Sequence, residues 1–484
     1  MSFRRLADFL ERLDQAGELA RIDCAVSPHL EAAEIVRRTA LHGGPAICFG
    51  SLEGNNTPIA ANLLGTESRI ALALGVRAID EVAARLERIV HPEQPEGWFA
   101  RLKTPPYVAA MESLPPRTIR TGPCQQVVRL GNDVDLERLP LLQAAPDEPR
   151  LSLQGALLFT VEPSTGRPVT SRCPLELVDP THLAVCLSDH DAFAGVVAEY
   201  VRRRQTMPLA AVLGGSPLLS LAASMPSSPG SDVCRLAALL QEKPIDVVKC
   251  RSIELQAPAE AEMVLEGQIA PAEPWTEVGP LATPTGFYRP AGRGPMVQVT
   301  AMTERASPVV PALIPGPPPN EESVMRRAMA RILLPLLRLS IPGLADYDLP
   351  LAAAARHMAV LAIEKSHAGQ AHTVVHAAWG SPWLRFARLL VVVDAQVDVR
   401  DPVQVERAIA CHFEPGRDVI LGTGPPDPID PAAPAHNLPR RLAMDATSKL
   451  AGECPGPGAK PVAPADEIMR KVTSRWPEYK LGLE

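Results

Sequence analysis

Two histidines four residues apart are the clearest metal-ligand candidates that general spacing rules identify. His372 and His376 lie in the segment HTVVH, and on a helix they would share one face. A third ligand, either His367 or His412, would be needed to complete a zinc-type site. Two polar positions on a surface helix show the same spacing, and that is the commoner arrangement.

A second candidate is the pair Cys411-His412, which lies beside Glu414. Such a pair could act as nucleophile and base, although a structural pair is commoner. The chain contains no G-x-G-x-x-G, Walker A, H-E-x-x-H or G-x-S-x-G pattern. General motifs therefore assign no reaction to it.

The elements that would position catalytic groups form an α/β pattern in the first 115 residues. Apolar residues at helical spacing predict helices within 3–20, 30–42 and 79–90, with short strands between them. The stretch 116–312 changes to short apolar runs separated by turn residues, which predicts a split β-barrel domain.

The last third of the chain again alternates strands and helices. Residues 313–323 form a Pro-rich linker, and 324–484 predict an α/β domain with a largely parallel sheet and a terminal helix. The fold class is therefore mixed α+β, with an N-terminal α/β domain, a central split barrel and a C-terminal α/β domain.

Composition narrows the class of protein. The 484 residues are 46% hydrophobic and 21% charged with a net charge of −7, which argues against a nucleic-acid partner. Nine scattered cysteines form no C-x-x-C pair, and no apolar run reaches transmembrane length. We expect a cytoplasmic protein without disulfides or a membrane-spanning segment.

Several long stretches resemble the UbiD decarboxylases, the 3-polyprenyl-4-hydroxybenzoate carboxy-lyase family. The resemblance lies in the N-terminal segment 3–49, in GPCQQVVRLGNDVDLERLPLL (122–142), in PGPPPNEE (315–322) and in MDAT (444–447), all in family order. It implies an α/β domain, a flavin-binding split barrel and a C-terminal domain that dimerises. It also implies prenylated FMN, Mn²⁺ and K⁺, and reversible non-oxidative decarboxylation of aromatic or α,β-unsaturated acids.

That chemistry requires particular residue types. Loss of CO₂ leaves a carbanion, for which the modified flavin is the electron sink. A tuned carboxylic acid must supply a proton, an arginine must orient it, and hard oxygen ligands with a histidine must hold the cation.

The flavin segment of the family has the form Asn-x-Gly-(Ile/Met)-x-Arg, and VTSRCP (169–174) occupies its place. In this alignment, Val169 occupies the position of the family's metal-binding asparagine, and Pro174 occupies the position of its catalytic arginine. Arg172 lies two positions earlier. The resemblance assigns cofactor contacts to Ser171 and Arg172.

The metal ligands are also altered. The family histidine matches His190, whereas the metal-binding glutamate aligns with Val233, beside Asp232. We therefore predict His190 and Asp232 as metal ligands, with His190 and Met225 also contacting the cofactor. Asp232 could instead cap the helix that follows it.

The acid loop of the family carries two acids, but EVGPLATPTGFY (277–288) places Val278 and Thr283 at those positions. Glu277 lies one residue before the first of these two positions. It is the candidate proton donor, with Arg172 as its partner. A one-residue slip in extended backbone would turn the side chain to the opposite face.

Three functions stay open. The first is a non-standard or accessory UbiD-like subunit, which would work with a catalytic UbiD-type paralogue and form a homo-oligomer, either a dimer or a hexamer. The second is an active decarboxylase with a remodelled site, in which Glu277 and Arg172 act on an aromatic or unsaturated carboxylic acid. The third is a ligand-binding protein that is not an enzyme.

Overall fold

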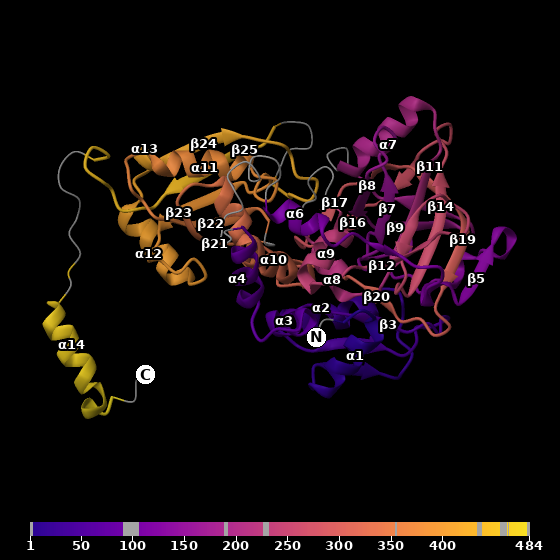
Figure 1. Cartoon of the computed structure of the whole chain (residues 1–484), viewed down its shortest axis with the longest axis horizontal. Coiled ribbons are helices and arrows are strands. Elements are labelled where there is room, and N and C mark those ends of the chain that lie inside the picture. Colours follow the sequence, from indigo (N-terminus) through magenta and orange to yellow (C-terminus); the bar gives the residue numbers. More distant parts are fainter. Residues whose placement is uncertain are drawn as a thin grey trace.

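The three largest sheets lie around one long helix in the computed structural model of the chain (Figure 1). The structure describes residues 3–90, 106–187, 192–225, 232–353, 356–432, 438–454, 462 and 464–481.

The first sheet belongs mainly to the N-terminal region and has the order β1-β2-β3-β20. Its strands are β1 (Leu19–Ile22), β2 (Ala46–Phe49), β3 (Ile59–Ala61) and β20 (Val310–Ala312). The helices of this region are α1 (Leu6–Gln15), α2 (Glu31–Leu41), α3 (Glu67–Leu74) and α4 (Asp80–Val90). Because β20 pairs in parallel with β3, the chain returns to this sheet after completing the barrel.

The second sheet is curled and contains nine strands, with β5 pairing with β19 beside the main path β6-β9-β10-β19-β14-β11-β7-β8. Its strands are β5 (Val127–Leu130), β6 (Ser152–Leu153), β7 (Leu157–Val161), β8 (Pro168–Arg172), β9 (Leu175–Asp179), β10 (His182–Val185), β11 (Met207–Leu213), β14 (Met263–Ile269) and β19 (Met296–Glu304). A register shift at Glu266/Gly267 marks a bulge, which is a common cause of bending in a strand. Gly267 is required there, because a Cβ would lie 2.5 Å from the carbonyl oxygen of Gln298.

Smaller elements connect the barrel to the rest of the molecule. They are the helices α6 (Pro106–Glu112), α7 (Ala192–Arg203), α8 (Pro217–Ala222) and α9 (Val233–Gln241), and the strands β4 (Arg117–Thr118), β12 (Asp246–Lys249), β13 (Gln256–Pro258), β15 (Thr276–Val278), β16 (Leu281–Ala282), β17 (Tyr288–Arg289) and β18 (Gly292–Gly294). Short 3₁₀ turns are η1 (Pro123–Gln125), η2 (Gly131–Asp133), η3 (Leu136–Arg138), η4 (Leu351–Ala353) and η5 (Trp476–Tyr479).

The third sheet has the order β21-β22-β23-β25-β24, with a parallel centre and antiparallel edges. Its strands are β21 (Leu344–Asp348), β22 (Met358–Ile363), β23 (Leu389–Asp394), β24 (Val419–Thr423) and β25 (Arg440–Asp445), and its helices are α11 (Gln370–Gly380), α12 (Pro402–His412) and α13 (Pro415–Asp418). The apolar runs of β22 and β23 are buried almost throughout, as expected for parallel strands covered on both faces. Helix α14 (Asp466–Arg475) lies apart from this body (Figure 1).

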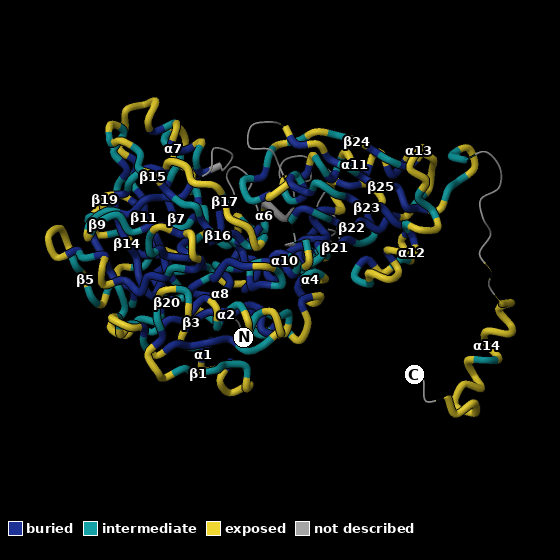
Figure 2. Tube along the Cα trace, turned by 180° about the vertical axis from the view of Figure 1, so that it is seen from behind, coloured by how far each residue is buried: buried dark blue, intermediate teal, exposed yellow. Residues whose placement is uncertain are grey.

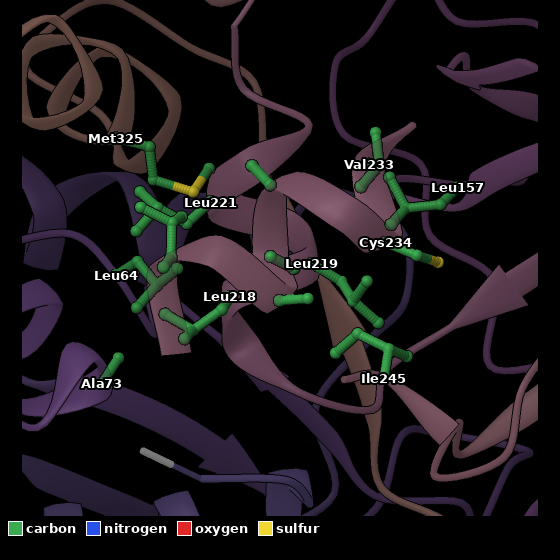
Figure 3. Close-up of a cluster of buried hydrophobic side chains, with 14 of the residues drawn as sticks. Leu64, Ala73, Leu157, Leu218, Leu219, Leu221, Val233, Cys234, Ile245 and Met325 are labelled. Atoms are coloured by element: carbon green, nitrogen blue, oxygen red, sulfur yellow. The ribbon is translucent and has the colours of Figure 1, made fainter. Parts of the chain in front are cut away.

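Helix α10 (Glu321–Ser340) lies where the three regions meet, and it contacts α3, α4, α8 and β21. Figure 2 shows it passing through the buried interior, in contrast to the exposed α14. Its residue Met325 lies beside Leu221 of α8 in the largest apolar cluster (Figure 3). Asn320 caps the helix with a capping box. Its side-chain oxygen accepts from the backbone amide of Ser323, and the Ser323 hydroxyl accepts from the backbone amide of Asn320.

The predicted fold class is confirmed: an α/β region, a curled half-barrel and a C-terminal α/β region occur in that order. Within the described ranges, none of the helices combines the length and the apolar character needed to cross a bilayer.

Replacing Asn320 by alanine should lower the free energy of unfolding by about 2 kcal/mol, because the variant loses the cap and leaves buried carbonyl groups unpaired. The side-chain amide nitrogen of Asn320 donates to the carbonyl oxygens of Pro284 and Gly316 at 2.8 and 2.7 Å. Urea denaturation measures the change. The control Asn132→Ala alters an exposed asparagine and should change stability by less than about 0.5 kcal/mol. Equal effects of the two substitutions would contradict the role of Asn320.

Candidate functional site

A cavity of about 230 Å³ lies where the barrel, α10 and loops of the C-terminal region meet. The barrel contributes Thr170–Pro174, Cys186 and the turn Leu281–Pro284 to its wall. Helix α10 contributes Glu322 and Arg326, and the C-terminal region contributes Arg356, Arg385, Phe386, Pro428 and Ile429. The cavity therefore depends on segments that are far apart in the sequence.

Arg172 ends strand β8 and lines the cavity. One terminal nitrogen of its guanidinium donates to the carbonyl oxygen of Ser220, whereas its buried Nε has no hydrogen-bond partner. Burial lowers the pKa of Arg172, and the nearby Glu322 opposes that effect. An arginine stays charged at neutral pH even after such a shift, so Arg172 contributes a half-buried cation.

Glu322 and Arg326 lie one turn apart on α10 and form an ion pair inside the cavity wall. Their side chains are 14% and 10% exposed, so water screens the pair weakly. Burial alone would raise the pKa of Glu322, but Arg326 and Arg172 outweigh burial and hold that pKa below its ordinary value. Glu322 is therefore an ionised carboxylate and a poor proton donor at neutral pH.

Glu321, its neighbour in sequence, has the opposite protonation behaviour. Its carboxylate accepts from the Leu64 amide at 2.8 Å and lines a small adjoining cavity of about 30 Å³, which also includes Arg172. Burial raises the pKa of Glu321 to about 6. Its carboxyl group can therefore carry or release a proton near neutral pH.

The C-terminal region places two guanidinium groups against one aromatic ring. Arg356 and Arg385 lie 4.4 and 4.7 Å from the centroid of Phe386, within the range of cation–π attraction. Arg356 also pairs with Asp427 at 2.5 Å, and Nε2 of His357 lies 3.0 Å from the same carboxylate oxygen. Asp427 therefore neutralises Arg356 and leaves the charge of Arg385 available.

The acid loop follows a course that separates its candidate residues. On β15, Glu277 is exposed and Val278 is buried in an apolar cluster with Cys186 and Leu281. Successive side chains of a strand point to opposite faces, so the pairing of β15 directs Glu277 away from that cluster. Thr283 lines the cavity, but its hydroxyl donates to the carbonyl oxygen of Phe287 at 2.8 Å within the same loop.

The predicted metal and cofactor positions also separate. The Asp232 carboxylate accepts from the Cys234 amide at 2.8 Å and caps α9, whereas Val233 lines the cavity. Met225 lines the cavity as well. His190 lies outside the described residues.

Of the residues predicted from the sequence as catalytic, cofactor or metal contacts, the cavity brings together Ser171, Arg172 and Met225. Glu277 and Asp232 are not among its lining residues. Along α11, His372 and His376 are both exposed, and among the described residues no three His, Cys, Asp or Glu side chains gather as a metal site would require.

Sequence reasoning missed the charged groups on α10 and in the C-terminal region. Glu322 lies inside the segment PGPPPNEE, whose sequence indicates only a family match and a stiff linker. The spacing of Glu322 and Arg326 is a helical ion-pair signal, but it does not indicate that both side chains are buried. No local signal marks Arg385.

The site lies within a chain that matches the UbiD family along most of its length. Residues 10–89 match the 3-octaprenyl-4-hydroxybenzoate carboxy-lyase N-terminal domain, 117–318 the Rift-related domain, and 323–450 the C-terminal domain. The chain belongs to the UbiD family, whose fold is that of a decarboxylase.

Solved structures are similar to this chain over nearly its whole length. An evolved dimeric form of the UbiD-class enzyme HmfF from Pelotomaculum thermopropionicum, in complex with prFMN, is 25% identical, with a TM-score of 0.77 over 96% of this chain and 98% of that chain. The closed form of Sedimentibacter hydroxybenzoicus vanillic acid decarboxylase is 22% identical and has a TM-score of 0.87 over 99% of this chain and 100% of that chain. The second likeness shows the fold alone.

Substitution of the two adjacent glutamates should have opposite effects on the pH dependence of stability. The lowered pKa of Glu322 means that its contribution is present above the unfolded value, 4.5, and is lost as the pH falls through the lower folded value. Glu322→Gln should therefore be less stable than the wild type at pH 7, with a smaller loss of stability between about pH 5 and pH 3.

Glu321 has a raised pKa, so its contribution is present below 4.5 and is lost as the pH rises through about 6. The shift corresponds to about 2 kcal/mol. Glu321→Gln should remove that part of the stability loss between about pH 4.5 and pH 7. Urea titrations at several pH values measure both effects, with exposed Glu277→Gln as the control. Parallel pH profiles for all three variants would contradict the assigned protonation states.

Proposed function

We propose that this chain is a non-standard UbiD-family subunit that keeps an organic-ligand cavity and acts as an accessory partner. The main support is the acid loop, where Val278 is buried among apolar side chains and the Thr283 hydroxyl is bonded within its own loop. Neither side chain can relay a proton to a carbanion as a carboxylic acid would. The exposed position of Glu277 strengthens the proposal.

The cavity residues fit an organic cofactor of the flavin type. Thr170 Oγ1 and Arg172 Nε are buried without hydrogen-bond partners, so both have capacity to contact a ligand. Ser171, Arg172 and Met225 would hold prenylated FMN, which would supply the electron sink when bound. Arg172 would orient a carboxylate of an aromatic or unsaturated acid.

Mn²⁺ does not fit the part of the site that the structure describes. Val169 and Val233 offer no ligand atom, and Asp232 is engaged as a helix cap. The described residues therefore do not supply a ligand set for a divalent cation.

Partner association completes the proposal. Helix α14 lies apart from the body and exposes Ile468 and Met469, with exposed Trp476 directly after it. Exposed apolar groups on one helix favour association with another chain. A homo-oligomer, either a dimer or a hexamer, or a complex with a catalytic UbiD-type paralogue would cover them.

An active decarboxylase with a remodelled site is the second candidate. The observation that favours it is Glu321, with its pKa of about 6 and its position in the small cavity that also includes Arg172. Glu277 is the alternative acid and would have to turn inward. A ligand-binding protein that is not an enzyme would need the cavity alone.

Co-expression with a prenyl-FMN synthase should yield a protein that releases no CO₂ from aromatic or cinnamic-type acids above an empty-vector control. The absorbance spectrum of the purified protein tests for bound flavin separately. CO₂ release by flavin-loaded protein would overturn the accessory role. In that case Glu277→Gln and Glu321→Gln, compared with exposed Glu112→Gln, would show which acid is required.

A further inference from the structure

The cavity wall carries an excess of positive charge. Five arginines and a single carboxylate, Glu322, line it among the described residues. The arginines are Arg172, Arg289, Arg326, Arg356 and Arg385. A cavity left by imperfect packing alone would not be expected to have this composition, because buried arginines are rare unless they are paired.

Two of the five charges are neutralised inside the protein. Arg326 pairs with Glu322, and Arg356 pairs with Asp427. The described part of the chain places no carboxylate within ion-pair distance of Arg172, Arg289 or Arg385. Arg289 donates instead to the carbonyl oxygen of Cys186 at 3.0 Å. The site therefore retains positive charge that an anion could neutralise.

Unused hydrogen-bond donors occur on the same side chains. The Nε atoms of Arg172, Arg326 and Arg385 are buried and lack a hydrogen-bond partner. Oγ1 of the buried Thr170 also lacks one. Leaving a buried donor unpaired costs about 1–3 kcal/mol, and more when the group is charged. A ligand that accepts these hydrogen bonds would recover that free energy.

The rest of the wall is apolar. Phe386 lies against the guanidinium groups of Arg356 and Arg385, and Leu281 and Ile314 line the same space. Stacking on the ring limits the freedom of both guanidinium groups and directs their N–H edges. A small inorganic anion would leave this apolar surface uncovered, whereas an organic anion with a flat apolar body would cover it.

We infer that the cavity binds an organic oxyanion, a carboxylate or a phosphate ester, through Arg172 and Arg385, and that arginine side chains replace a divalent cation as its counter-charge. Arg172 comes from the barrel and Arg385 from the C-terminal region, so the ligand would bridge the two. This inference deepens the proposed function and rests on it for the place of the ligand. It goes beyond that function in assigning the counter-charge of the ligand to arginine side chains.

Binding of matched probes to the full chain tests this inference by isothermal titration calorimetry. FMN is compared with riboflavin, which lacks the phosphate, and cinnamate is compared with cinnamamide, which lacks the charge. At least one anion should bind roughly tenfold or more tightly than its neutral counterpart, with the same Kd in EDTA and in Mn²⁺. A preference for FMN identifies phosphate as the recognised group, and a preference for cinnamate identifies carboxylate. Equal binding of anion and neutral probe, no binding of either anion, or loss of binding in EDTA would overturn the inference.

Substitutions then locate the contacts. Arg385→Gln and Arg172→Gln should each weaken the preferred anion by roughly tenfold or more, and Arg385→Lys should restore part of the affinity. Arg202→Gln removes an exposed arginine of α7 that does not line the cavity, and it should leave the Kd unchanged. Circular dichroism verifies that each variant is folded.

Unchanged affinity in both Arg385→Gln and Arg385→Lys would overturn the part assigned to Arg385, even if Arg172→Gln fails to fold. The result is separable from the proposed accessory role, since CO₂ release would refute that role without altering any Kd. Loss of the anion preference would refute the present inference without creating activity.

Discussion

The burial of Glu322 between Arg326 and Arg172 is the interaction on which the site depends. Removing charged groups from water costs several kcal/mol per ion, and attraction repays that cost only when the geometry is held closely. Here the geometry depends on the first turn of α10, which the Asn320 capping box holds in place. A shift of this turn would separate the charges and leave them buried without partners.

The same helix joins the three parts of the fold. Its apolar residues pack in the largest core cluster with helices of the N-terminal region and with α8, while its first turns face the cavity. Packing in this core and ion pairing in the cavity therefore support one another. The largest apolar cluster contains no residue of the acid loop 277–288, so the packing of this core does not depend on the residues of that loop.

The cavity carries net positive charge among its described lining residues, and the single carboxylate among them is held ionised. The carboxylate inside it is kept ionised by two arginines, and the carboxyl group with a pKa near neutrality, Glu321, lines the smaller adjoining space. An ionised glutamate among several arginines reduces their mutual repulsion but leaves net positive charge. Such a site is suited to an anionic ligand.

The sequence by itself determined the local elements, the order of the three regions and the family. Continuous apolar runs marked strands such as β22 and β23, which are covered on both faces, and apolar residues at helical spacing marked helices such as α12. The resemblance to the UbiD family located the segment 169–174, from which Ser171 and Arg172 reach the cavity. Only the tertiary structure decided which polar groups meet there. Strand pairing turned Glu277 outward, capping engaged Asp232, and Arg172 and Arg385, which are far apart in the sequence, came to line one cavity. Side-chain direction and the convergence of distant segments depend on packing between elements, and neither is encoded in the spacing of neighbouring residues.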